Sequence, residues 1–211
     1  MTSENIFGTL FSSYPALEVC KDDIYAAFGL LLTAAKKKAL IMACGNGGSA
    51  ADSEHIVGEL MKGFNLMRPL SEKEKKAFDG IENGEYIADK LQGAIKAVSL
   101  VSQSGLISAF ANDIDPSLVF AQQVWGYASS PDDVLIVLST SGNSKNVVNA
   151  AKTARAAGIK TLAVTGEKES ALSSLADATV KLPAHTPFEV QELTLPVYHA
   201  LCAALEAELF G

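Results

Sequence analysis

Residues 133–144 read DVLIVLSTSGNS, an apolar run that ends in a loop rich in hydroxyl groups. The run 133–138 has the length and the β-branched content of a buried strand. Residues 145–157 then carry a helical pattern, so the loop joins a strand to a helix. A buried strand that leads into a helix is the repeating unit of a parallel sheet covered by helices.

The same unit recurs along the chain. Four further apolar runs resemble the first one and are expected to be strands: 39–44, 97–101, 161–165 and 178–182. The remaining helical patterns cover 50–62, 116–127, 170–175 and 188–209. This alternation predicts an α/β fold, a doubly wound, flavodoxin-like parallel sheet of five strands with helices on both faces. In such sheets, ligands bind beyond the carboxyl ends of the strands.

The chain 1–211 is expected to form a single domain, because 211 residues are too few for two comfortable ones. Residues 1–37 read as N-terminal helices, which SSYP interrupts at 12–15 and which resume from residue 16. Residues 65–84 contain the charge cluster SEKEKK and two turn signals, and we interpret them as a solvated helical insert on the rim.

Composition limits the possible partners. The net charge is −7 and the pI is near 5.0, so a nucleic-acid partner is not expected. The three cysteines form no CxxC pair, which favours a reducing compartment. The N-terminal residues do not read as a secretory signal, and the apolar run 25–35 is too short to span a bilayer. We therefore expect a cytoplasmic protein without a membrane partner.

The loop 139–144 is the sharpest functional signal. Ser139, Thr140, Ser141 and Ser144 place four hydroxyl groups at the start of a helix, where free N–H groups and the helix dipole attract anions. Gly142 lets the backbone approach a ligand closely. The alternative is a simple capping turn, but a cap requires only one hydroxyl group. The loop therefore predicts a phosphate site.

A second loop, GNGGS at 45–49, also joins a strand to a helix. It matches neither the P-loop nor the dinucleotide fingerprint, so its ligand is expected to be smaller than a nucleotide. Together the two loops predict one phosphate-binding edge.

Polar side chains on the helical stretches suggest acid–base or metal chemistry. His55 and Glu59 are four residues apart, so they share a helix face and could bind a divalent metal, although an ordinary polar pair is the commoner outcome. Gln191 and His199 are eight residues apart, about 12 Å on an ideal helix, and Pro196 between them is expected to disturb that helix. From spacing alone, a lone histidine in the apolar stretch 195–205 is more often a core residue than a ligand.

Taken together, these motifs resemble the phosphoheptose isomerase family, whose members have the sugar isomerase (SIS) fold. The resemblance runs from about residue 20 to the end of the chain. It is carried by GNGGS at 45–49, His55, Glu59, STSGNS at 139–144, Gln191-Glu192 and His199.

The resemblance implies an enzyme that converts sedoheptulose 7-phosphate to D-glycero-D-manno-heptose 7-phosphate through an enediol. It implies that Glu59 acts as the base and His199 as the acid, or the reverse. It also implies a homotetramer with sites at subunit interfaces. The residues implied to bind the phosphate and sugar are Asn46, Gly47, Gly48, Ser49, Ser139, Thr140, Ser141, Ser144 and Gln191. The residues implied to ligate one zinc ion are His55, Glu59, Gln191 and His199.

The chain departs from the family pattern at three places. Gln103 stands where the family often has Asp, Lys62 stands near a usual Arg, and the insert is longer than expected. These departures keep open an isomerase for another phosphosugar. A sensor or adaptor of the same fold without enzymatic activity also stays open, although the joint presence of the four zinc-ligand candidates argues against it.

Overall fold

Five short apolar runs form the sheet in the computed structural model, which describes residues 2–211. The strands are β1 (Ile41–Gly45), β2 (Ala97–Ser99), β3 (Val134–Leu138), β4 (Lys160–Gly166) and β5 (Ala178–Leu182). All neighbouring strands are parallel and their order is β2-β1-β3-β4-β5. The predicted flavodoxin-like sheet is therefore confirmed.

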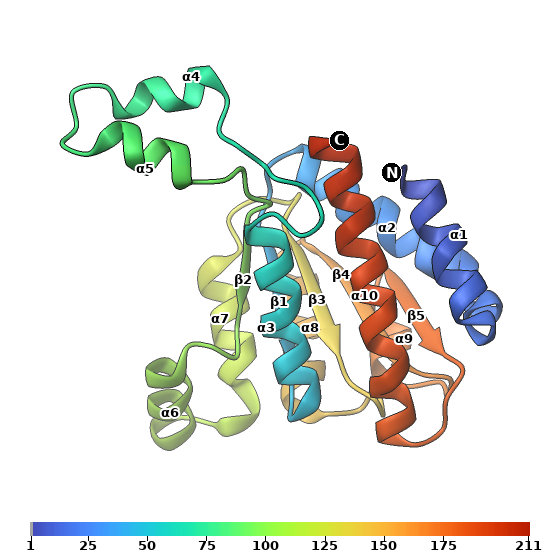
Figure 1. The fold of residues 1–211 in the computed structure, drawn as a ribbon. Helices are drawn as coiled ribbons and strands as arrows, with labels where there is room; N and C mark the ends of the chain where they lie inside the picture. Colours follow the sequence, from blue (N-terminus) through green and yellow to red (C-terminus); the bar gives the residue numbers. More distant parts are fainter. Residues whose placement is uncertain (1) are drawn as a thin grey trace.

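Helices cover both faces of the sheet (Figure 1). One face carries α2 (Lys21–Lys36), α3 (Gly48–Met61) and α10 (Pro187–Phe210), and α1 (Ser3–Ser13) packs against α10. The other face carries α7 (Val119–Tyr127), α8 (Lys145–Ala156) and α9 (Ala171–Leu175). Alternate residues of β1 enter the two cores: Ile41 and Ala43 face α10, whereas Met42 and Cys44 face α8. The sheet is thus buried on both sides, which explains its continuous apolar runs.

Three local features differ from the sequence expectation. A helix that was not predicted, α6 (Ser104–Asp113), follows β2; it contains no fully buried residue, and only part of its apolar side, including Ile107 and Phe110, packs against the core. A 3₁₀ helix, Pro15–Cys20, precedes α2, so the predicted helix from residue 16 is divided. Pro196 lies inside α10 without ending it, because the buried length of this helix packs along α1, α2 and α3.

The helix α10 is long and apolar enough to cross a membrane by length and composition alone. However, 56% of its most apolar window is buried inside the protein. This burial is typical of the core helix of a soluble protein.

The insert forms an arm that projects away from the sheet (Figure 1). It contains α4 (Glu72–Lys75), a 3₁₀ turn (Lys76–Phe78) and α5 (Gly84–Lys90), which contact mainly one another. A bridge between Pro69 and Gln92 closes its base. The arm is therefore solvated over most of its length, as its charge cluster predicts.

A buried ion pair fixes the segment between α3 and the arm. The Glu206 carboxylate on α10 accepts hydrogen bonds from the Arg68 Nε group at 2.7 Å and from the backbone N–H groups of residues 64, 65 and 66. Both side chains are at most 1% exposed. Burial alone would raise the pKa of Glu206, but these donors hold it below its usual value. Arg68 also donates to the carbonyl groups of Glu59 and Leu60, so the pair anchors the C-terminal end of α3.

A second buried carboxylate joins the starts of two strands. Asp133 accepts hydrogen bonds from the backbone N–H groups of Leu40 at 2.8 Å and of Ser129 and Ser130 at 2.9 Å. Burial opposes its ionisation, but these donors outweigh burial and lower the pKa of Asp133 below its usual value.

This lowered pKa predicts a pH-dependent contribution to stability. A folded pKa below the unfolded value, about 3.9, stabilises the protein fully above about pH 5, and this stabilisation is lost as the pH falls through the folded pKa. We expect Asp133→Asn to lower the free energy of unfolding by about 1–3 kcal/mol at pH 7, because three N–H groups then lose an ionised acceptor. Urea unfolding should show that the difference in the free energy of unfolding between the wild-type protein and Asp133→Asn becomes smaller from pH 7 to pH 3. A difference of constant size would contradict this account.

Candidate active site

The two predicted phosphate loops lie side by side. They follow β1 and β3, which are neighbours with Gly45 paired to Leu138, so both loops leave the same edge of the sheet. Gly47 and Gly142 have φ angles of +56° and +65°, a region that favours glycine. A Cβ atom at Gly142 would also lie 2.1 Å from Ser170 Oγ. Both turns therefore need glycine at these positions.

The N-cap residue of neither helix that starts at these loops caps it with its side chain, although Asn146 Oδ1 accepts a hydrogen bond from the Val147 N–H group in the first turn of α8. Gly47 is the N-cap of α3 and has no side chain to offer, and the Ser144 hydroxyl accepts no hydrogen bond from the first turn of α8. Instead, the Ser144 Oγ atom lies 3.1 Å from Ser139 Oγ. The capping explanation of the serine loop therefore does not account for Ser144. Two helix N-termini at one edge, without side-chain caps from their N-cap residues, make a favourable place for an anion.

An amide pair connects the two loops. Asn46 and Asn146 each donate from Nδ2 to the other's Oδ1, at 2.8 and 2.9 Å. Asn146 was not identified from the sequence, because a polar residue in the first turn of a helix is common. The pair fixes the side chain of Asn46, the predicted sugar contact, between the two loops.

Three of the candidate metal ligands, two of which are also the candidate catalytic residues, meet between α3 and α10. His55 Nε2 lies 3.1 Å from Glu59 Oε1 and 3.4 Å from His199 Nε2. The predicted pair on α3 is therefore present, and α10 brings His199 to it. Burial, together with the charge of His55, lowers the pKa of His199 against the opposing effect of Glu59. Lys62, which stands near the family's usual Arg, lies with its Nζ atom 3.3 Å from Glu59 Oε2.

Gln191 lies at the other end of this helix pair. A Cβ atom at Gly48 would come within 2.7 Å of Gln191 Nε2, so this amide abuts the glycine loop. Within residues 2–211, no hydrogen bond joins Gln191 to the three clustered side chains. The Gln191 amide therefore lies at the glycine loop, a position that its spacing from His199 in the sequence did not predict.

The cluster matches zinc in its donor types and in two spacings. Imidazole nitrogens bind zinc at about 2.0–2.1 Å, so two ligands of a tetrahedral ion lie about 3.3 Å apart. The 3.4 Å separation of the two imidazoles and the 3.1 Å separation of His55 and Glu59 are close to this value. Over the described residues, however, no three His, Cys, Asp or Glu side chains form a complete metal-binding group.

Two residues beside the cluster were missed by sequence reasoning. The Tyr198 hydroxyl oxygen lies 2.9 Å from His55 Nδ1 and 3.3 Å from Asp52 Oδ1. Burial and the nearby Asp52 raise the pKa of Tyr198, which keeps the hydroxyl protonated. Burial also raises the pKa of Asp52, while the Tyr198 hydroxyl and His55 lower it in part. Tyr198 escaped notice because it lies in an apolar stretch and reads as a core residue.

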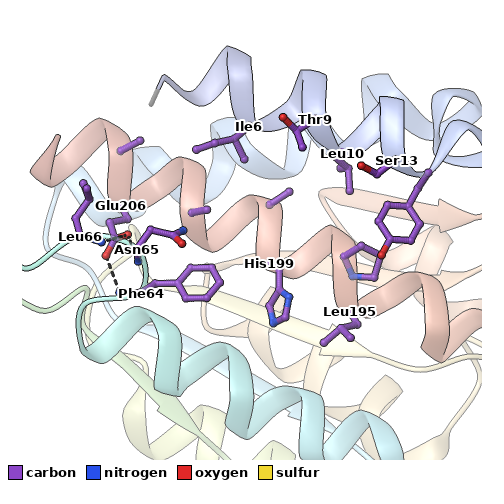
Figure 2. A pocket seen from close by; sticks show the side chains of 15 residues that line it. Ile6, Thr9, Leu10, Ser13, Phe64, Asn65, Leu66, Leu195, His199 and Glu206 are labelled. Atoms are coloured by element: carbon purple, nitrogen blue, oxygen red, sulfur yellow. Dashed lines mark hydrogen bonds between the residues drawn. The ribbon is translucent and has the colours of Figure 1, made fainter.

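A large apolar hollow lies beside His199, away from the phosphate loops. A groove of about 550 Å³ runs between α1, α10 and the segment 64–66, and its lining includes Ile6, Leu10, Phe64 and Leu195 (Figure 2). The His199 ring projects from α10 between Phe64 and Leu195 in this view. A smaller cavity of about 270 Å³ is lined by Thr140, Ser141 and residues that follow β4 and β5.

A glycine substitution tests the placement of Gln191. We expect Gly48→Ala to displace the Gln191 amide and to lower kcat/KM about tenfold or more, since a Cβ atom would overlap it. The flexible amide can move, so the melting temperature should change by only a few degrees. Gly58→Ala on the same helix is the matched control, because a Cβ atom there meets no atom within 4 Å. Equal activity of both variants would remove Gln191 from the site.

Comparisons with known proteins identify relatives of this chain. A family model described as the SIS domain matches residues 117–205. The phosphoheptose isomerase of Akkermansia muciniphila is 32% identical over 199 residues, which cover 94% of this chain and 92% of that protein. That of Nitratiruptor sp. is 34% identical over 183 residues, with coverages of 87% and 84%. The solved structure of the phosphoheptose isomerase from Neisseria gonorrhoeae is 26% identical, has a TM-score of 0.72, and the match covers 97% of this chain and 98% of that one.

Proposed function

The chain belongs to the phosphoheptose isomerase family, and on this premise we propose that it interconverts sedoheptulose 7-phosphate and D-glycero-D-manno-heptose 7-phosphate. It is an aldose–ketose isomerase with the SIS fold. The observation that carries the proposal is the contact of His199 with the His55–Glu59 pair on α3, the helix that begins at the glycine loop.

The distance along α3 suits a long sugar phosphate. His55 lies seven residues after Gly48, about 10 Å along the helix axis. In sedoheptulose 7-phosphate, the phosphate and the reacting carbons C1 and C2 lie at opposite ends of the molecule. The loop hydroxyls and N–H groups would hold the phosphate, and the cluster would meet the carbonyl end. The hydroxyls proposed to do this belong to Ser49, Ser139, Thr140, Ser141 and Ser144.

The reaction moves one proton between C1 and C2 and another between the two oxygens. In the proposed roles, Glu59 takes the proton from C1 and returns it to C2, with an enediol between the two steps. His199 protonates the carbonyl oxygen and accepts a proton from the neighbouring hydroxyl. Lys62 donates a hydrogen bond at 3.3 Å to the second oxygen of Glu59 and orients it.

Zinc is proposed as the cofactor, with His55, Glu59 and His199 as its ligands and Gln191 as the fourth. The donor types and the two spacings given above support the first three ligands. A bound zinc ion would polarise the carbonyl group and stabilise the negative charge of the intermediate. Gln191 would have to turn from the glycine loop toward the cluster.

A cytoplasmic homotetramer with sites at subunit interfaces is also proposed. The apolar groove that begins at His199 supports this assembly, because a large apolar hollow beside a polar cluster suits a protein partner better than a phosphosugar. Light scattering of the purified protein measures the assembly directly, and a monomer at micromolar concentration would contradict it.

A second candidate substrate is another phosphosugar of similar length. Gln103, at the N-cap of α6, and the arm at residues 69–92 motivate it. The test is a panel of five- to seven-carbon ketose phosphates, assayed with and without zinc, with the unphosphorylated sugars as controls. We expect sedoheptulose 7-phosphate to give the highest kcat/KM. A protein that turns over none of them and binds no zinc would favour the sensor or adaptor reading of the fold.

A further inference from the structure

The Tyr198 hydroxyl group connects two residues of α3 from the opposite helix. Its oxygen lies 2.9 Å from His55 Nδ1 and 3.3 Å from Asp52 Oδ1. Tyr198 is only 4% exposed, and its ring packs edge-on against the rings of both His55 and His199. The position of this hydroxyl is therefore fixed by the packing of α10 against α3.

Counting protons assigns the direction of each hydrogen bond. A tyrosine hydroxyl has one proton to donate, and an ionised carboxylate only accepts. When Tyr198 donates to Asp52, the Nδ1 atom of His55 must carry a proton and donate it to the tyrosine oxygen. In the neutral imidazole with this proton on Nδ1, the Nε2 atom of His55 carries a lone pair.

This lone pair faces the other members of the cluster. His55 Nε2 lies 3.1 Å from a Glu59 oxygen, which is also an acceptor, and 3.4 Å from His199 Nε2. Two acceptors that face each other at this distance repel unless a proton or a metal cation lies between them. The tautomer set by Tyr198 and Asp52 is thus the one that a metal-binding His55 requires.

We propose that Tyr198, anchored by Asp52, is a positioning residue that fixes the His55 tautomer and so prepares Nε2 to bind zinc. The inference rests on the proposed zinc site and extends it by a second layer of residues. Partners of this kind fix the ring orientation of a metal-binding histidine and raise its basicity, and their loss weakens metal binding about 10–100-fold.

The test compares zinc affinities at pH 8, measured by competition with a chromophoric chelator. Tyr198→Phe should bind zinc about 10–100-fold more weakly than the wild-type protein. Tyr86→Phe on the projecting arm removes the same hydroxyl group from a site 67% exposed and should bind within twofold. Asp52→Asn is the second variant. Its amide can donate to the tyrosine and so redirect the tyrosine proton to His55 Nδ1, which should weaken zinc binding as well.

A spectroscopic readout separates positioning from simple structural damage. In the zinc-loaded wild-type protein, ¹⁵N NMR should show His55 protonated at Nδ1, with slow exchange of that proton. In Tyr198→Phe the proton should exchange quickly, while the melting temperature of the metal-free protein stays within a few degrees. Unchanged zinc affinity in both Tyr198→Phe and Asp52→Asn would overturn the inference, as would a His55 protonated at Nε2 in the loaded wild-type protein.

The outcomes also separate this inference from the proposed function. A wild-type protein that binds no zinc refutes the zinc site and this inference together. A protein that binds zinc tightly, loses it in Tyr198→Phe and isomerises no sugar phosphate refutes the proposed function and leaves the positioning role in place.

Discussion

Replacement of Glu59 by glutamine is expected to lower kcat by about 10²–10⁴-fold, the usual contribution of a general base. The amide has nearly the same shape as the carboxylate but cannot accept a proton from carbon. The Glu59 side chain lies 3.1 Å from His55, accepts a hydrogen bond from Lys62 at 3.3 Å and is only 12% exposed. The variant therefore keeps the position of the side chain but loses the general base. Steady-state kinetics with sedoheptulose 7-phosphate measure the effect.

The matched control for this change is Glu54→Gln on the same helix. Glu54 accepts a hydrogen bond from Ser102 and does not belong to the cluster, so its loss should leave kcat within about threefold. His199→Ala should lower kcat as severely as Glu59→Gln does. Activity of Glu59→Gln close to that of the wild-type protein would remove Glu59 from the proton transfer.

Arg68→Met is expected to lower the free energy of unfolding by about 3–5 kcal/mol, because it leaves the Glu206 carboxylate buried without its partner. The change also removes the donors to the carbonyl groups of Glu59 and Leu60, which hold the C-terminal end of α3. Urea denaturation followed by circular dichroism measures the loss. We also expect lower activity, since the end of α3 carries Glu59.

Two further variants test whether the burial of the Arg68–Glu206 pair accounts for the loss of stability. Lys160→Met breaks an exposed pair with Asp177, in which the lysine side chain is 62% exposed, and should cost less than about 1 kcal/mol. The double variant Arg68→Met with Glu206→Leu should lose less stability than the sum of the single losses, because no charge is left buried. A loss below about 1 kcal/mol in Arg68→Met alone would show that the buried pair does not hold the segment.

Local sequence patterns predicted the sheet and the loops. The five strands are apolar runs bounded by turns, and their boundaries in the structure differ by only a few residues from those expected. The two phosphate loops were found because glycine and hydroxyl residues cluster where β1 and β3 end. The His55–Glu59 pair follows from the helical period alone.

Contacts between distant parts of the chain could not be predicted in this way. His199 joins His55 only because α10 packs on α3, across 144 residues of sequence. The pairs Arg68–Glu206 and Asn46–Asn146 likewise join residues 138 and 100 positions apart. Tyr198 resembled an ordinary core residue, and only its hydroxyl contacts reveal its place beside the site.

The most direct test of the proposed proton transfer is isomerisation of sedoheptulose 7-phosphate in D₂O, followed by NMR of the sugars as the reaction reaches equilibrium. A carbon-bound proton that passes through the Glu59 carboxylate exchanges with solvent, so the account predicts deuterium at C2 of the aldose. An aldose product that forms in good yield without deuterium at C2 would contradict it.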